Sequence, residues 1–258
     1  MGFVPTMGAL HAGHLSLIEK SIEQCNHTVV SIFVNKKQFA PDEDFDDYPR
    51  TLKEDLEALK KLRVDVLFLP DNNLIYPKNY STYVEEISLS DGLESNSRPH
   101  FFRGVLTVVL KLLNIVSPNC AYFGKKDIQQ LKLVEKMVQD LNLDIKIVPG
   151  KTVREKNGLA MSSRNQYLSK KTYADLKIIY ATLLDAKDRI GGGEKTSSII
   201  KKEIKEQLLS LEGLKIDYIE ITDARFLSPI EKIDQNIIIS LAVFVTGIRL
   251  IDNIEIAI

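Results

Sequence analysis

The chain has 258 residues, of which 44% are hydrophobic and 27% are charged, a composition typical of a globular protein with one large or two modest domains. Its 34 basic and 35 acidic residues nearly cancel, which argues against a dedicated nucleic-acid binder. The longest apolar run, around residues 237–245, is far shorter than the ~20 residues of a membrane span, and the N-terminus lacks a secretory signal pattern. We therefore expect a cytoplasmic protein. Cys25 and Cys120 show neither metal-site nor disulfide spacing.

The first half alternates short β-branched runs with amphipathic helical patterns. Strands are predicted at residues 2–5, 28–34, 64–69, 121–123 and 145–148, and helices at 15–22, 51–62, 104–116 and 127–141. Thr51 and Glu54 fit a capping box at the start of one helix. Strand–helix alternation with apolar strands predicts an α/β fold, with a Rossmann-like parallel sheet covered by helices on both faces. We expect this domain to span residues 1–152.

The pattern changes beyond about residue 150. Apolar residues from Tyr173 to Leu184 recur at helical spacing, and the glycines at 191–193 end that helix. A lysine-rich helix is predicted at 199–211, followed by three strand-like runs at residues 216–221, 237–245 and 248–254. These elements predict a smaller α+β domain over residues 153–258.

Ligands of open parallel sheets bind beyond the carboxyl ends of the strands, and the loop after the first strand has the sharpest motif. Residues 5–14 read Pro-Thr-Met-Gly-Ala-Leu-His-Ala-Gly-His. Glycines there allow a close backbone approach to a ligand, and the following helix N-terminus presents N–H groups and a positive dipole end to phosphates. Alternatively, Gly8 and Gly13 only serve the turn. A metal-binding histidine pair is disfavoured, because no carboxylate stands at a matching offset.

Three further loops follow predicted strands. Residues 158–165, Gly-Leu-Ala-Met-Ser-Ser-Arg-Asn, offer hydroxyls and a guanidinium for a triphosphate, although a solvated turn also explains them. Residues 123–130 offer two lysines, or else a helix start in which Asp127 and Gln130 form a capping box. Residues 33–39 offer the amides of Asn35 and Gln38, or else a plain strand-terminating turn.

The four loops together supply phosphate-binding groups and amides, but no obvious nucleophile. A site of this kind suits catalysis by positioning and electrostatics, as in phosphoryl and nucleotidyl transfer.

These motifs resemble the pantothenate synthetase family, within the HIGH-type nucleotidyltransferase superfamily. The resemblance covers nearly the whole chain and is carried by six segments: residues 5–14, 30–39, 48–51, 123–131, 158–165 and 249–253. The chain departs from the family pattern in three places. It starts without the usual preceding helical segment, Lys36 replaces a common proline, and His100 is displaced by one position in the stretch of residues 98–102.

The resemblance implies an ATP-dependent ligase that joins pantoate to β-alanine through a pantoyl-adenylate, releasing AMP and pyrophosphate. It also implies a homodimer, Mg²⁺, ATP and pantoate binding by the first domain, and a lid role for the second. The implied catalytic groups are His14, His11, Lys126 and Arg164; Gln38, Gln130 and Asn35 would bind pantoate and β-alanine, and Asp55 would contact Mg²⁺. The implied ATP-binding residues are Met7, Gly8, Ala9, Leu10, His11, Ala12, Gly13, His14, Gly124, Lys125, Lys126, Asp127, Val153, Met161, Ser162, Ser163 and Arg164.

Two rival functions remain open. One is a nucleotidyltransferase that adenylates a phosphate, similar to a phosphopantetheine adenylyltransferase. The other is a non-catalytic nucleotide-binding module. A tRNA synthetase is disfavoured, because no basic RNA-binding module is evident.

Overall fold

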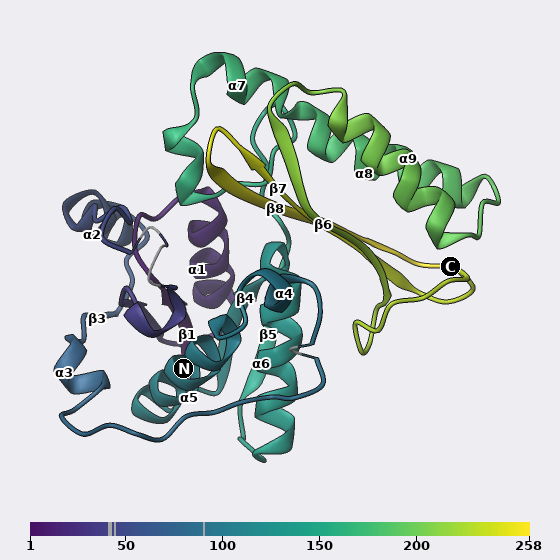
Figure 1. The fold of residues 1–258 in the computed structure, drawn as a ribbon. Coiled ribbons are helices and arrows are strands. Elements are labelled where there is room, and N and C mark those ends of the chain that lie inside the picture. The colour runs from purple at the N-terminus through teal and green to yellow at the C-terminus, as the bar shows by residue number, and fades with distance from the viewer. Residues whose placement is uncertain (41–42, 44, 90) are drawn as a thin grey trace. The chain divides into compact units, whose positions relative to one another are not determined.

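The computed structural model describes residues 1–40, 43, 45–89 and 91–258. The chain divides into two compact units, each with its own sheet (Figure 1). The first unit comprises residues 1–125 and 130–152, and the second comprises residues 126–129 and 153–258. The predicted roles of the two halves, substrate binding and lid, stay predictions.

The first unit is built on a five-stranded parallel sheet. Its strands are β1 (Gly2–Thr6), β2 (Thr28–Ile32), β3 (Val66–Phe68), β4 (Cys120–Gly124) and β5 (Lys146–Gly150). They lie in the order β3-β2-β1-β4-β5, and every pair is parallel. The alternation of apolar strands with helical patterns therefore predicted the parallel sheet correctly.

Helices flank this sheet: α1 (Ala12–Gln24), α2 (Leu52–Lys61), α3 (Asn72–Ile75), α4 (Glu94–Ser97), α5 (Phe101–Val116) and α6 (Ile128–Asp140), with 3₁₀ turns η1 (Lys36–Gln38) and η2 (Lys125–Asp127). The apolar face of α1 packs on the sheet through Leu17 and Ile18, which join Val4, Val30 and Tyr122 in one buried cluster. Burial of these side chains fixes α1, and with it the loop that precedes α1, against the strands.

The predicted capping box at α2 is wrong. Thr51 is the N-cap residue, but its side chain accepts no backbone N–H. Its hydroxyl instead donates to Asp55 Oδ1 at 3.2 Å. The Thr51 backbone has φ −113° and ψ 45°, rather than the extended conformation typical of an N-cap residue whose side chain accepts a backbone N–H.

The second unit has a three-stranded antiparallel sheet in the order β6-β7-β8. Its elements are η3 (Ser163–Tyr167), α7 (Lys170–Asp175), α8 (Lys177–Gly191), α9 (Ser197–Leu209), β6 (Leu214–Asp223), β7 (Ile237–Val245) and β8 (Ile248–Ile256). The single helix predicted through Tyr173 and Leu184 is two helices, because the backbone at the fully buried Leu176 turns to ψ −3° between them.

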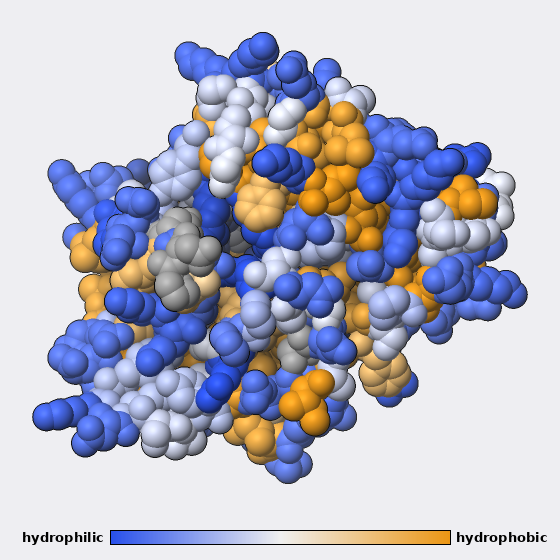
Figure 2. Space-filling model, in the orientation of Figure 1, coloured by the Kyte–Doolittle hydropathy of each residue, from blue (hydrophilic) through white to orange (hydrophobic). Residues whose placement is uncertain are grey.

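Apolar side chains from α8, α9 and the antiparallel sheet form the core of the second unit, including Leu183, Ile200, Leu208, Ile239 and Leu241. On the face drawn in Figure 2, apolar side chains gather over the region of α8 and this sheet. The observed sheets and helices confirm the predicted α/β class with a smaller C-terminal α+β part.

None of the helices in the described ranges has the length and apolar character needed to cross a membrane. Cys25 and Cys120 are free, partly buried thiols.

Candidate active site

The first unit carries a large part of the predicted site at one edge of its sheet. The strand order reverses between β1 and β4, and open parallel sheets bind ligands at such a switch point, beyond the carboxyl ends of the strands. The segment of residues 7–14 follows β1, and Gly124 and Lys125 lie at the end of β4. Two predicted ATP-binding segments therefore leave the sheet from neighbouring strands.

The two histidines of the 7–14 segment are held by backbone hydrogen bonds. His11 is the N-cap of α1, and its Nδ1 accepts from Gly13 N at 3.1 Å. His14 Nδ1 accepts from His11 N at 3.3 Å, and the ring centroids are 4.1 Å apart. Because both Nδ1 atoms act as acceptors, the neutral form of each ring carries its hydrogen on Nε2. The start of α1 thus combines two imidazole donors with a helix N-terminus, which suits an anion.

The turn between β1 and α1 is bonded to α2. Asp55, predicted as a metal contact, is 2% exposed, and its two oxygens accept from Ala9 N and Leu10 N. Across the described parts of the chain, no group of three His, Cys, Asp or Glu side chains is placed to hold a metal ion. The donor set at Asp55 therefore does not fit a protein-built metal site.

Asn35 and Gln38, the predicted substrate amides, form one buried network. Asn35 is 1% exposed, and its Nδ2 donates to Gln38 Oε1 and to Gly104 O, both at 3.1 Å. Its Oδ1 accepts from Tyr76 Oη at 2.8 Å and from Lys37 N at 3.3 Å. The amide of Asn35 is thus fully used inside the protein, and it fixes the orientation of Gln38 rather than offering a further donor.

Gln38 in turn reaches the 7–14 segment. Its Nε2 contacts Met7 Sδ at 3.1 Å, so a predicted substrate-binding residue adjoins a predicted ATP-binding residue. Burial raises the pKa of the Tyr76 hydroxyl, with Tyr80 adding to the effect. Tyr76 therefore stays a protonated donor to Asn35 throughout the physiological range.

The segment after β4 is divided between the units. Gly124, Lys125 and Gln130 belong to the first unit, whereas Lys126 and Asp127 belong to the second. Asn253 on β8 donates from Nδ2 to Lys126 O at 2.8 Å, which ties the 126–129 segment to the C-terminal sheet.

The loop that contains residues 161–164 is an ordered turn within the second unit. Met161 N donates to Val153 O at 3.0 Å, and Gly158 makes the reversal at φ +91°. Ser162 caps η3 by accepting from Arg164 N at 3.3 Å. The glycine-led segment is therefore held by its own hydrogen bonds, and Val153 lies beside the residues predicted to bind ATP with it.

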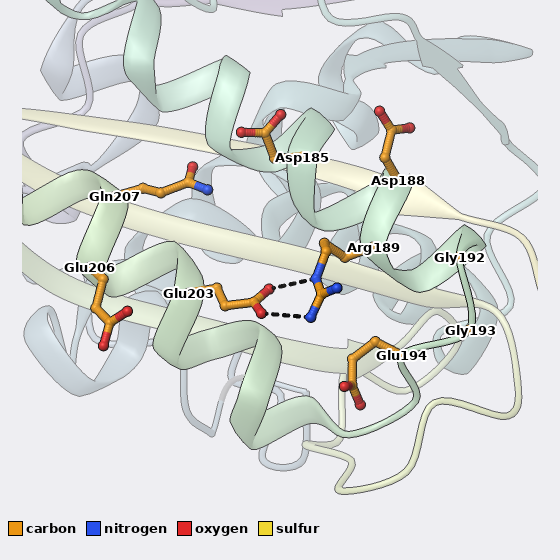
Figure 3. Close-up of a pocket in the computed structure, with 9 residues that line it drawn as sticks. All are labelled: Asp185, Asp188, Arg189, Gly192, Gly193, Glu194, Glu203, Glu206 and Gln207. Carbon is orange, nitrogen blue, oxygen red and sulfur yellow. Dashed lines mark hydrogen bonds and ion pairs between the residues drawn. The ribbon is translucent and has the colours of Figure 1, made fainter.

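A separate hollow of about 940 Å³ lies in the second unit where α8 meets α9 (Figure 3). Its titratable lining is mostly acidic, and the Arg189 guanidinium in that lining points to Glu203 and bonds to it at 2.8 and 3.2 Å. Such a surface repels a triphosphate. None of the predicted site residues lines this hollow, so it does not compete with the switch-point edge as the candidate site.

The family model for pantoate-beta-alanine ligase matches residues 1–255. The chain belongs to the pantoate–β-alanine ligase family. It is 53% identical to the pantothenate synthetases of Thermosipho africanus and Fervidobacterium nodosum over 253 residues, covering 98% of this chain and 91% and 90% of those proteins. The resemblance seen in the motifs is thereby confirmed, and the chain is an enzyme of this ligase family.

Solved structures of the family share the fold. A pantothenate synthetase from Thermus thermophilus superposes with a TM-score of 0.95 at 40% identity, covering all of this chain and 93% of that one. A pantoate–β-alanine ligase from Francisella tularensis, complexed with "Beta-gamma ATP" and β-alanine, gives a TM-score of 0.79 at 37% identity, with 98% and 88% coverage.

Sequence reasoning missed several residues that shape this ligase. Tyr76 and Gly104 lie in regions without a recognised motif, yet both bond to Asn35. Asp252 and Asn253 stand inside the 249–253 segment, which carried the resemblance but no assigned role. In the structure this segment holds other parts of the second unit, since Asp252 binds Arg154 and Asn253 binds the Lys126 carbonyl.

Proposed function

We propose that this enzyme condenses pantoate with β-alanine to form pantothenate, with conversion of ATP to AMP and pyrophosphate. The observation that carries the proposal is family membership along 255 of 258 residues. The related Francisella tularensis ligase, complexed with "Beta-gamma ATP" and β-alanine, supports the choice of substrates.

The chemistry we propose has two steps. A pantoate carboxylate oxygen attacks the α-phosphorus of ATP, so that a P–O bond forms and pyrophosphate leaves. The β-alanine amine then attacks the acyl carbon of the pantoyl-adenylate, loses a proton, and expels AMP. Adenylation supplies the leaving group that a free carboxylate lacks, so no covalent enzyme intermediate is needed, in keeping with motifs that contain no obvious nucleophile.

We assign the phosphate chemistry to four basic side chains. His11 and His14 would donate from Nε2 to phosphate oxygens, and His14 is the candidate acid. Lys126 and Arg164 would stabilise the departing pyrophosphate, since cations placed where charge develops lower the barrier. The residues proposed to line the nucleotide are Met7 to His14, Gly124 to Asp127, Val153, and Met161 to Arg164.

The acid and amine substrates would be held by amides. We assign Gln38 and Gln130 to pantoate, and Gln38 also to β-alanine. Asn35 contributes by holding Gln38, because its own amide groups are bonded within the protein.

Magnesium would enter with ATP, held by phosphate oxygens and water, because Mg²⁺ in nucleotide sites keeps several of its waters and binds substrate phosphates with only one or two carboxylates rather than a cage of protein ligands. Assembly as a homodimer, a cytoplasmic location and a lid role for the second unit are further predictions of family membership. Light scattering on the purified protein tests the first of these.

Product analysis tests the proposed reaction. Purified protein with ATP, Mg²⁺, pantoate and β-alanine should release AMP and pyrophosphate in equal amounts. Release of AMP at the same rate without pantoate would refute the substrate assignment. Pyrophosphate without free AMP would indicate an adenylyltransferase, and ATP binding without turnover in calorimetry would indicate a non-catalytic module.

A further inference from the structure

The turn that leads into α1 has a backbone conformation that needs outside support. Gly8 has φ +82° and the next residue, Ala9, has φ +49°. For a residue with a side chain, the left-handed region costs roughly 1–2 kcal/mol. Two successive residues in this region reverse the chain between β1 and His11, and something must hold them there.

Asp55 supplies that support from α2. Its Oδ2 accepts from Ala9 N at 2.9 Å and its Oδ1 accepts from Leu10 N at 2.8 Å. Thr51 Oγ1 donates to the same Oδ1 at 3.2 Å. Asp55 lies in the first turn of α2, where the helix dipole favours a negative charge. Three donors and a helix N-terminus therefore hold one buried carboxylate, and that carboxylate holds the turn.

The fit between the turn and the carboxylate is close. A Cβ at Gly8 would stand 3.1 Å from Asp55 Oδ2 and 3.0 Å from Ile32 Cγ2. No added group fits between turn and carboxylate without displacing one of them. Gly8 thus serves this contact as well as the positive φ.

We propose that Asp55 is a positioning residue, which fixes the Gly8–Leu10 backbone so that the His11 and His14 rings face ATP, and that it is not a metal ligand. This inference rests on the proposed function, because it assigns the turn to ATP binding. Asp55 acts through the N–H groups of Ala9 and Leu10, while Thr51 orients its carboxylate.

The test is Asp55→Asn, which replaces one acceptor oxygen by an NH₂ that faces a backbone N–H. Amide hydrogen exchange at Ala9 and Leu10 should accelerate at least tenfold, while exchange at Ile18 within α1 stays as in wild type. The kcat/KM for ATP should fall about 10- to 100-fold, the equivalent of one lost charge-assisted hydrogen bond. The Mg²⁺ concentration for half-maximal rate at saturating ATP should not change.

Glu54→Gln is the matched control, because Glu54 is exposed on the same helical turn and should behave as wild type. Thr51→Val keeps the side-chain shape and removes one donor to Asp55. It should accelerate amide exchange at Ala9 and Leu10 by a smaller factor than Asp55→Asn. This variant tests the inference even if Asp55→Asn does not fold. Unchanged exchange at Ala9 and Leu10 in Asp55→Asn overturns the proposal, as does a raised Mg²⁺ requirement. Failure of wild type to make AMP would instead refute the proposed function, since the exchange measurement does not depend on turnover.

Discussion

Arg154 and Asp252 form a buried ion pair that joins the 153–165 loop to the C-terminal sheet. Arg154 Nη1 donates to Asp252 Oδ2 at 2.6 Å and Nη2 donates to Oδ1 at 2.9 Å. The guanidinium also lies over the Tyr180 ring, 3.5 Å from its centroid. The Asp252 side chain is 1% exposed, so its charge has almost no access to water.

Replacing Arg154 by methionine keeps an unbranched side chain but leaves this carboxylate buried without its cation. Removing one partner of a buried pair costs about 3–5 kcal/mol of unfolding free energy. At roughly 2–4 °C per kcal/mol for a protein near this size, the melting temperature of the protein should fall by about 6–20 °C.

The loss of unfolding free energy in Arg154→Met should depend on pH, because burial shifts the pKa of Asp252. Burial raises the pKa of Asp252 above its ordinary value of 3.8, and Arg154 opposes that rise. Without Arg154 the pKa rises further, so the folded variant binds more protons than the unfolded chain above pH 3.8. The stability of Arg154→Met should therefore fall as pH rises through the raised pKa, and its deficit should shrink toward pH 4.

Calorimetry and urea unfolding at several pH values measure both effects. The double variant Arg154→Met with Asp252→Asn should regain part of the loss, because the buried charge is gone and the amide oxygen still accepts from Asn253 N. Arg189→Met is the control, since the Arg189–Glu203 pair is exposed in the same unit and exposed pairs contribute little. If Arg154→Met were no less stable than Arg189→Met, the reasoning from burial would be refuted.

Three further variants test other parts of the molecule. His14→Ala should fold normally and lose about 10²–10³-fold in AMP formation; a near-normal rate would remove His14 from the mechanism. Gly104→Ala would place a Cβ 2.2 Å from the backbone carbonyl of Lys37, so urea unfolding should show a loss of about 1–3 kcal/mol, and unchanged stability would contradict this packing. Hydrogen bonds from the Thr28 N–H and then from His27 lower the pKa of Asp65, so Asp65→Asn should be less stable than wild type at pH 7. This deficit should disappear below pH 3.8, as the wild-type carboxyl protonates. An equal deficit at pH 3 would contradict this reasoning.

The sheet of the first unit could be predicted because its signal is local. Runs such as residues 28–34 are apolar and β-branched, and an amphipathic helix follows or precedes each one. Boundaries shifted by a few residues, with β2 ending at Ile32, because strand ends depend on which neighbours pair with them. The break at Leu176 was not predictable from periodicity, since α7 and α8 both continue the same apolar spacing.

The site residues were found as motifs, but their partners were not. Asp55 is 45 positions from Leu10 in the chain, and Tyr76 is 41 positions from Asn35. Such pairs form only when strands and helices dock, and no pattern in one sequence reports a contact at that separation. The type of residue at the site was therefore predictable, whereas the acceptor or donor that each one uses was not.

This difference separates the predicted site residues into two classes, those that bond within the protein and those that keep a donor for a ligand. Asn35 and Asp55 direct their polar atoms at the protein's own groups, while His11 and His14 use Nδ1 for the backbone and carry a donor on Nε2. A residue whose polar atoms are bonded inside the protein can affect the reaction only by moving another group, so its loss should alter substrate affinity and local amide exchange together. A residue that contacts the substrate should alter rate or affinity while leaving the exchange of neighbouring amides unchanged. Kinetics paired with amide exchange therefore separates the two classes.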